Sequence, residues 1–272
     1  MSQQVLKQHG RSFYFASQFM GHEDAAIAAR LYALCRQIDD LADETADRHA
    51  LALLQSAIEQ RDITHPMVAE YLSLAPGMPS APLQQLVAGA ISDLGEVAIA
   101  DLAELLVYAH QVAGTVGQMM CAIYQVSDPR ADAHAVALGQ AMQMTNIARD
   151  VVTDAKMGRR YLPAQWVGEL TGPAIVHPHE VDRRRLKSGI EQLLDLADEY
   201  YEFGLEGLGY LPPRVALTVE VAARVYREIG MRLRQSGMDV WAGRAVVPQV
   251  DKVLIGANCA LGWALQNRAG RR

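Results

Sequence analysis

The chain has 272 residues, half of them apolar, and a net charge of -6 at pH 7. That length and composition allow a sizeable core within one domain, and we predict a single domain over residues 1–272. Acidic and basic residues are scattered, with no basic stripe to neutralise a phosphate backbone, which argues against nucleic acid as a partner. The three cysteines lie far apart without paired spacing, which favours a reducing, cytoplasmic setting.

Helical periodicity runs along the whole sequence and alternating strand patterns are nearly absent, so the predicted fold class is all-α. Segments rich in proline or glycine, at 73–82, 171–179 and 207–213, separate the helices. The sequence predicts six main helices, over residues 22–46, 83–100, 101–125, 131–156, 181–204 and 214–236.

The two most apolar windows, 105–124 and 246–265, each contain polar residues that prevent a clean membrane span. We therefore interpret both windows as buried helices. The first 15 residues lack the apolar core of a signal peptide, so we expect no export. Peripheral contact with the inner face of a membrane stays open if the ligand is a lipid.

Acidic residues end the first predicted helix, which is otherwise largely apolar. Asp39 and Asp43 are four residues apart, so both carboxylates project from one face of the helix, and Tyr32 and Arg36 continue that stripe. The helix over 131–156 repeats the pattern. Its polar line consists of Gln143, Asn146, Asp150 and Asp154.

Carboxylates at this spacing repel one another, and their burial is costly unless a cation meets them. Mg²⁺ prefers hard oxygen ligands and commonly joins one or two carboxylates to substrate phosphates. A single such pair is usually a solvated helix face. Two pairs, each beside an apolar run and each with an arginine within a turn (Arg36, Arg149), favour a metal and diphosphate site. We expect the metal-free protein to tolerate Asp39→Ala or Asp150→Ala, because each change removes a repulsive charge.

Several segments resemble the squalene and phytoene synthase family in order and spacing. They are HGRSFYFAS at the N-terminus, YALCRQIDDLAD, YAHQVAGTVG, QMTNIARDVVTDAKMGRRYLP and, further on, LPPRVAL, VYREIG and WAGR. The fourth segment is the most specific, and the C-terminal third is most similar to bacterial phytoene synthases. The resemblance implies a class I isoprenoid synthase fold, a helical bundle around a central cavity.

The same resemblance implies the roles of individual residues. Metal ligands would be Asp39, Asp43, Asp150 and Asp154, with Mg²⁺ as the cofactor. Catalytic residues would be Tyr32, Arg36, Tyr108, Arg149 and Tyr161. Substrate-binding residues would be His9, Ser12, Gln143, Asn146, Arg159 and Arg160. Taken alone, His9 is more often a surface histidine and Tyr108 more often a core residue.

Three positions depart from the family pattern. Where the family often has a basic residue, an arginine and a tyrosine, this chain has Ala25, Gly95 and Ile99. These departures leave room for a different substrate or product, so the reaction class is better defined than the product.

The predicted function is a head-to-head condensation of two prenyl diphosphates, with two geranylgeranyl diphosphates giving phytoene through a cyclopropyl intermediate, in carotenoid biosynthesis. Squalene or hydroxysqualene synthesis from farnesyl diphosphate is the first alternative. The glycine-rich segment 204–209 follows no strand and has the wrong spacing for a dinucleotide site. Squalene synthases of the family also lack a Rossmann unit, so NADPH use is undecided. A non-catalytic assembly factor of the same fold is a further alternative, and no protein partner is inferred.

Overall fold

The computed structural model describes residues 2–269, with side chains as far as Leu265, and this part of the chain is mostly helical. The α-helices are α1 (Ser2–His9), α2 (Arg11–Ser17), α3 (His22–Asp43), α4 (Arg48–Gln60), α5 (Pro66–Leu72), α6 (Ser80–Ser92), α7 (Leu102–Ala109), α8 (Thr115–Ile123), α9 (Arg130–Lys156), α10 (Ala164–Val167), α11 (Gly172–Val176), α12 (Glu180–Glu206), α13 (Pro213–Gln235) and α14 (Gln249–Ala269). A π-helical segment, η1 (His110–Gly114), joins α7 to α8, and a 3₁₀ turn, η2 (Gly207–Tyr210), follows α12. Strands β1 (Val97–Ala98) and β2 (Arg159–Arg160) pair in parallel.

Five of the six predicted helices are confirmed to within three residues at each end, because their apolar periodicity and their flanking prolines and glycines agree. One of the five, predicted over 101–125, is built from α7, η1 and α8. The helix predicted over 83–100 is wrong at its C-terminal end, since α6 stops at Ser92. Gly95 then adopts φ +117°, a conformation that L side chains rarely take, and the chain turns into β1.

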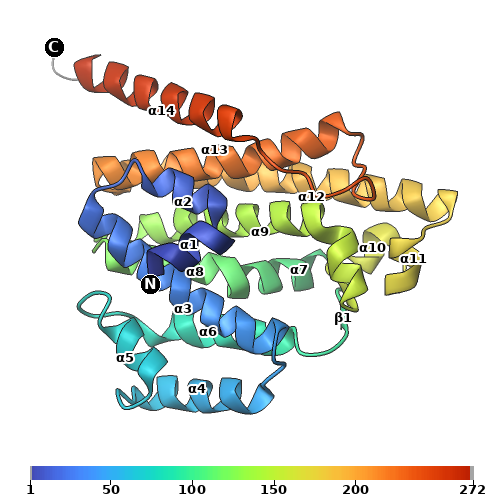
Figure 1. Cartoon of the computed structure of the whole chain (residues 1–272), viewed down its shortest axis with the longest axis horizontal. Coiled ribbons are helices and arrows are strands. Elements are labelled where there is room, and N and C mark those ends of the chain that lie inside the picture. Colours follow the sequence, from blue (N-terminus) through green and yellow to red (C-terminus); the bar gives the residue numbers. More distant parts are fainter. Residues whose placement is uncertain (1, 270–272) are drawn as a thin grey trace.

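The long helix α9 is the centre of the molecule and packs against α12, α13, α8 and η1 (Figure 1). Its approach to α8 is very close. A Cβ atom added at Gly117 would lie 2.2 Å from the carbonyl oxygen of Ala135, and one added at Gly139 would lie 2.3 Å from that of Ala113. Glycine at both positions therefore brings the backbone that follows Tyr108 against the second acidic helix.

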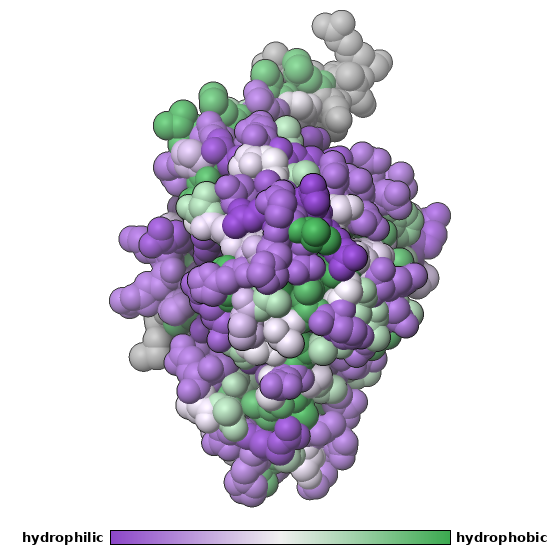
Figure 2. Space-filling view, turned by 90° about the vertical axis from the view of Figure 1, so that its right-hand side faces the viewer, coloured by the Kyte–Doolittle hydropathy of each residue, from purple (hydrophilic) through white to green (hydrophobic). Residues whose placement is uncertain are grey.

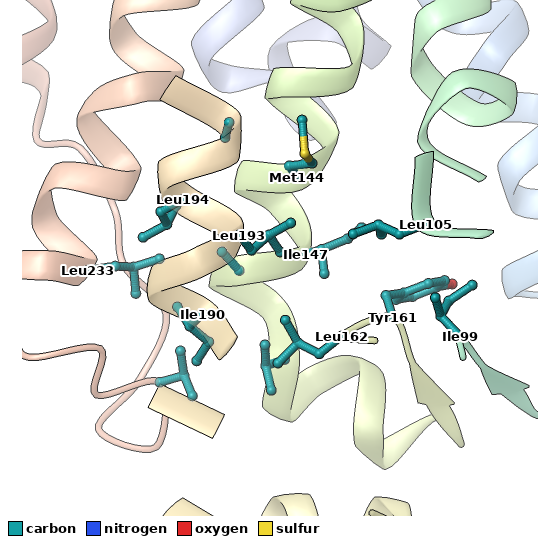
Figure 3. Packing of buried hydrophobic residues seen from close by; sticks show 14 of the residues in the cluster. Ile99, Leu105, Met144, Ile147, Tyr161, Leu162, Ile190, Leu193, Leu194 and Leu233 are labelled. Atoms are coloured by element: carbon teal, nitrogen blue, oxygen red, sulfur yellow. The ribbon is translucent and has the colours of Figure 1, made fainter. Parts of the chain in front are cut away.

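One face of α9 belongs to the largest hydrophobic cluster. Ile147 of α9 lies beside Leu193 of α12 and Leu105 of α7, and Tyr161 lies beside Ile99 (Figure 3). Fully burying each large aliphatic side chain stabilises the fold by about 1.5 to 3 kcal/mol. Because this face is held in the core, the rotation of α9 about its axis is set, and so is the direction of its polar line.

The two most apolar windows differ in the structure. The segment 105–124 contains fully buried side chains such as Leu105 and Met119, which confirms a largely buried helix. The buried helix predicted at 246–265 is wrong, because Val250, Leu254 and Leu261 of α14 are 57% to 68% exposed. Among the described residues, no helix has the length and apolarity needed to cross a membrane.

Candidate active site

The acidic ends of α3 and α9 meet through Arg159. This arginine stands three residues after the end of α9. Its Nη1 donates to Asp43 Oδ1 at 2.7 Å, and its Nη2 donates to the carbonyl oxygen of Asp93 at 2.9 Å. Pairing of β2 with β1 holds the backbone of Arg159 in place. The charge of Arg159 also opposes the rise that burial causes in the pKa of Asp154, so the two acidic lines predicted from the sequence lie close together.

Asp39 and Asp154 are the carboxylates with the least compensation. Burial raises the pKa of Asp39 to about 7; Arg36 opposes the rise, and the carboxylates of Asp43 and Asp93 add to it. Burial likewise raises the pKa of Asp154 to about 7, with a further contribution from Asp150. A carboxyl group with so high a pKa lacks a sufficient counter-charge, so each of these positions favours the approach of a cation.

Asp150 is the opposite case. Arg149 donates to its two oxygens at 3.0 and 2.5 Å, and Arg244 donates to the same oxygens at 2.8 and 3.0 Å. Burial by itself would raise the pKa of Asp150, but the hydrogen bonds from the two arginines outweigh it and the pKa lies below its ordinary value. Asp150 is therefore ionised and already neutralised by protein groups.

Asp93, at the end of α6, connects two stacked tyrosines. The Tyr161 hydroxyl donates to Asp93 Oδ1 at 2.7 Å and the Tyr108 hydroxyl donates to Oδ2 at 2.9 Å. The two rings stack with centroids 4.6 Å apart. Asp101 caps the N-terminus of α7, the helix that carries Tyr108, and η1 starts two residues after Tyr108. The carboxylate thus fixes the position of two ring faces beside the acidic lines.

A second aromatic group surrounds Tyr32. Phe13 of α2 lies 6.1 Å from Tyr32 and 4.9 Å from Tyr226 between ring centroids. Burial raises the pKa of Tyr32 to about 12, so its hydroxyl stays protonated. Gly10 fits against the Tyr32 ring, where a Cβ atom would lie 2.8 Å from Cζ.

His9 and Ser12 flank Gly10 on α1 and α2. His9 is exposed and Ser12 is half-buried. The structure therefore places both on the segment that covers Tyr32, at the edge of the site.

The amide side chains of α9 lie next along the polar line. Asn146 Nδ2 donates to Gln143 Oε1 at 3.4 Å, which is a long contact. Asn146 Oδ1 is buried and has no hydrogen-bond partner among the described residues. An orphaned acceptor one turn from Asp150 is costly unless a ligand or an ion satisfies it.

The other two arginines predicted for the substrate have protein partners. Arg36 pairs with Asp40 at 2.5 Å and with Glu44 at 3.4 Å. Arg160 is buried and donates to the carbonyl oxygens of Ile99 and Leu162, and its other terminal nitrogen meets Glu169. These contacts indicate that Arg160 mainly stabilises the β1 and β2 region.

The donor set suits Mg²⁺ bound together with a diphosphate. Within residues 2–269, no three carboxylate, histidine or cysteine side chains converge on one point that would hold a bare ion. Mg²⁺ usually keeps several waters and takes one or two protein carboxylates plus substrate phosphates. Asp39 and Asp154, with the free Asn146 oxygen, supply oxygen donors of that kind.

Sequence reasoning missed three residues of the site: Asp93, Tyr226 and Arg244. Tyr226 and Arg244 stand in segments that carried the family resemblance, VYREIG and WAGR, but nothing local linked them to Tyr32 or Asp150. Asp93 offered only a weak signal, an acidic residue at the end of an apolar helix.

Comparisons with known proteins identify the family. Residues 6–251 match the family model described as squalene/phytoene synthase. The chain belongs to the squalene/phytoene synthase family. It is 32% identical to a 15-cis-phytoene synthase of Enterobacter agglomerans, over 96% of this chain and 94% of the relative. It is 34% identical to a phytoene synthase of Thermus thermophilus, over 92% and 88% of the two chains.

Solved structures of the family share the fold. A dehydrosqualene synthase in complex with a ligand aligns with a TM-score of 0.84 and 25% identity, over 95% of this chain and 94% of that chain. The squalene synthase HpnC from Alicyclobacillus acidocaldarius aligns with a TM-score of 0.72 over 87% and 92% of the chains, and at 22% identity it supports the fold alone. The chain is thus an all-α prenyltransferase of a family that condenses prenyl diphosphates head to head and uses a divalent metal to bind diphosphate.

Proposed function

We propose that this chain condenses two geranylgeranyl diphosphates head to head to give phytoene, with Mg²⁺ bound between the diphosphates and Asp39, Asp43, Asp150 and Asp154. The observation that carries the proposal is the pair of under-compensated carboxylates, Asp39 and Asp154, on two helices whose ends Arg159 joins. The names of the relatives at 32% and 34% identity support the substrate class.

The bound metal would supply positive charge that draws electron density from the leaving diphosphate. Arg149 and Arg244 contact Asp150, and Arg159 contacts Asp43; these arginines would hold diphosphate oxygens through charge-assisted hydrogen bonds. To do so, Arg149 and Arg244 would share their donors between Asp150 and the substrate. Catalysis of this kind is mainly electrostatic, because the charge is arranged before the bond breaks.

The aromatic groups would act on the cation that forms when diphosphate leaves. The double bond of the second substrate attacks the first carbocation, a proton is lost, and a cyclopropyl diphosphate results. Loss of the second diphosphate, rearrangement and loss of a second proton then give the triene. The ring faces of Tyr32, Tyr108 and Phe13 would stabilise each cation by about 0.5 to 2 kcal/mol. Asp93 would keep the Tyr108 and Tyr161 hydroxyls turned away from the carbocation.

Incubation with geranylgeranyl diphosphate and Mg²⁺, without reduced nicotinamide, tests the proposal. Mass spectrometry of the lipid extract should find phytoene, and two diphosphates should be released for each molecule formed. EDTA should stop both. If neither geranylgeranyl nor farnesyl diphosphate released diphosphate, the result would favour the alternative of a non-catalytic assembly factor.

A shorter product is the second candidate, favoured by the TM-score of 0.84 to a dehydrosqualene synthase. The family's arginine and tyrosine are replaced here by Gly95, whose φ of +117° suits glycine, and by Ile99, which is buried beside Tyr161. Farnesyl diphosphate in the same assay separates the candidates. A faster reaction with farnesyl than with geranylgeranyl diphosphate, or turnover that needs NADPH, would assign the shorter product.

We further propose that residues 1–272 act as one catalytic domain in the cytoplasm, and that the domain contacts a membrane surface when it releases its lipid product. The family match over residues 6–251 and the packing of α1 on α3 and of α2 on α13 support the single domain.

A further inference from the structure

The outer face of α14 is an apolar stripe that the rest of the described chain leaves uncovered. We define this outer face as Val250, Val253, Leu254, Ala257, Leu261, Ala264 and Leu265, all of them exposed. The five large side chains are 52% to 68% exposed, and Val246, one turn earlier, is 63% exposed. Asn258 is the one polar residue that interrupts the stripe. Figure 2 shows hydrophobic side chains gathered at the top of the molecule, where α14 runs.

The opposite face of α14 is already used. Gly256 lies against Phe19, two residues after the end of α2, where a Cβ atom would stand 2.5 Å from the ring. Cys259 is buried, and the Trp263 indole donates to Glu220 of α13 at 2.5 Å. A helix that is apolar on both faces is usually covered on both, and an exposed apolar stripe of this length marks an interaction surface.

The charge pattern identifies the kind of surface that fits. The chain has a net charge of -6, yet residues 252–272 contain no acidic residue. Three arginines, Arg268, Arg271 and Arg272, stand at the C-terminal end of the sequence. In sequence, an apolar helical stripe followed by a cationic segment is the pattern of a helix that lies in the interface of an anionic lipid bilayer.

We propose that α14 docks on the surface of an anionic phospholipid bilayer, with its outer face at the boundary between headgroups and acyl chains. Val250 to Leu265 span about 22 Å along a helix, which suits a helix lying in the membrane plane. This deepens the membrane contact proposed above, and its use for lipid substrates rests on the proposed function. The inner face of α14 packs on α13 and on α2, and Phe13 of α2 lies against Tyr32 of the site. Docking would therefore place the site one helix away from the bilayer.

Flotation of the full chain with lipid vesicles tests this docking. We expect binding to vesicles of phosphatidylcholine with about 30% phosphatidylglycerol, and much weaker binding to phosphatidylcholine alone or in about 0.5 M salt. The variant L254Q/L261Q should bind roughly 10-fold more weakly, because it loses apolar area from the outer face. The control L53Q/I63Q replaces two side chains that are 53% and 70% exposed near α4, far from α14 (Figure 1), and should bind within about 2-fold of the unaltered chain.

Three results would overturn the proposal: no binding of the unaltered chain, unchanged binding of L254Q/L261Q, or equal losses in both variants. Light scattering without lipid tests whether a second copy of the chain, rather than a bilayer, covers the outer face of α14. A dimer that L254Q/L261Q converts to a monomer, without vesicle binding, would assign the face to a second copy of the chain. Circular dichroism checks folding, and diphosphate release from detergent-dispersed substrate should be unchanged in L254Q/L261Q. Flotation does not depend on turnover, so failure of the proposed function and failure of docking are distinguishable.

Discussion

The acidic ends of α3 and α9 have the same spacing of aspartates but different counter-charges. Asp150 of α9 is 17% exposed and is held by two arginines, one of which, Arg244, lies 94 residues further along the chain. Asp43 of α3 is 35% exposed and has one ion pair, with Arg159. Each helix also carries one carboxylate with a pKa raised to about 7, Asp39 or Asp154. The α9 side is thus partly neutralised in advance, whereas the α3 side depends more on a cation that arrives with the substrate.

The largest expected effect is on turnover when an under-compensated carboxylate is neutralised. Asp39→Asn and Asp154→Asn should each lower kcat/KM for diphosphate release by about 10³-fold or more, since electrostatic groups of this kind contribute several kcal/mol to transition states. Both variants should melt at or above the normal temperature without metal, because a costly buried charge is removed. Asp132→Asn, at an exposed position on α9, is the control. Near-normal turnover in either site variant would refute the metal and diphosphate role.

The second prediction tests whether Asp150 is neutralised by its arginines in the metal-free protein. Asp150→Ala should destabilise the metal-free protein by about 3 kcal/mol, because it leaves the guanidinium of Arg149 buried without its partner. This reverses, for Asp150, the sequence-based expectation that removal of a repulsive carboxylate is tolerated. Asp43→Ala should cost at most about 1 kcal/mol, since Asp43 is 35% exposed and Arg159, although buried, keeps its hydrogen bond to the carbonyl oxygen of Asp93. Urea unfolding measures both, and equal losses would show that the two ends are held alike.

The third prediction concerns Asp93, which lies between the two ends and raises the pKa of both Asp39 and Asp154. The carboxylate accepts one tyrosine hydroxyl on each oxygen. In asparagine one of these oxygens becomes an amide nitrogen, which donates and cannot accept, so one ring would lose its fixed position. Asp93→Asn should lower kcat by about 10- to 100-fold, with KM changing less. Tyr108→Phe, which keeps the ring, should retain more activity than Asp93→Asn. An effect on KM alone would contradict a role in placing the rings.

The fourth prediction is a pH dependence of stability without metal. The folded pKa of Asp39 and Asp154 is about 7, above the ordinary value of 3.8, so the folded state binds protons that the unfolded state releases between these values. Stability should therefore fall as pH rises through about 4 to 7, by up to about 4 kcal/mol for each of the two groups. Calorimetry at both ends of the window measures the loss. Asp39→Asn should reduce this loss of stability. If Asp39→Asn and Asp154→Asn each lost as much stability over this pH range as the unaltered chain, the raised pKa values would be contradicted.

Helices and their polar faces follow from local sequence, and most of them were predicted from it. The spacing of Asp39 and Asp43, and of Asp150 and Asp154, fixes which carboxylates share a face, because an α-helix repeats every 3.6 residues. Apolar periodicity bounded by proline and glycine likewise predicts α3, α9, α12 and α13. The end of α6 was missed because Gly95 and the pairing of β1 with β2 interrupt a pattern that is still helical by composition.

The sequence by itself determined the all-α class, the two acidic lines and, by resemblance, the family. Only the tertiary structure decided which carboxylates have counter-charges, because Arg244 reaches Asp150 and Tyr161 reaches Asp93 across 94 and 68 residues of chain. It also decided that α14 lies on the surface with an apolar face exposed, although its composition predicts a buried helix. Local periodicity states which side chains share a face of a helix, but what lies opposite that face depends on how distant helices pack.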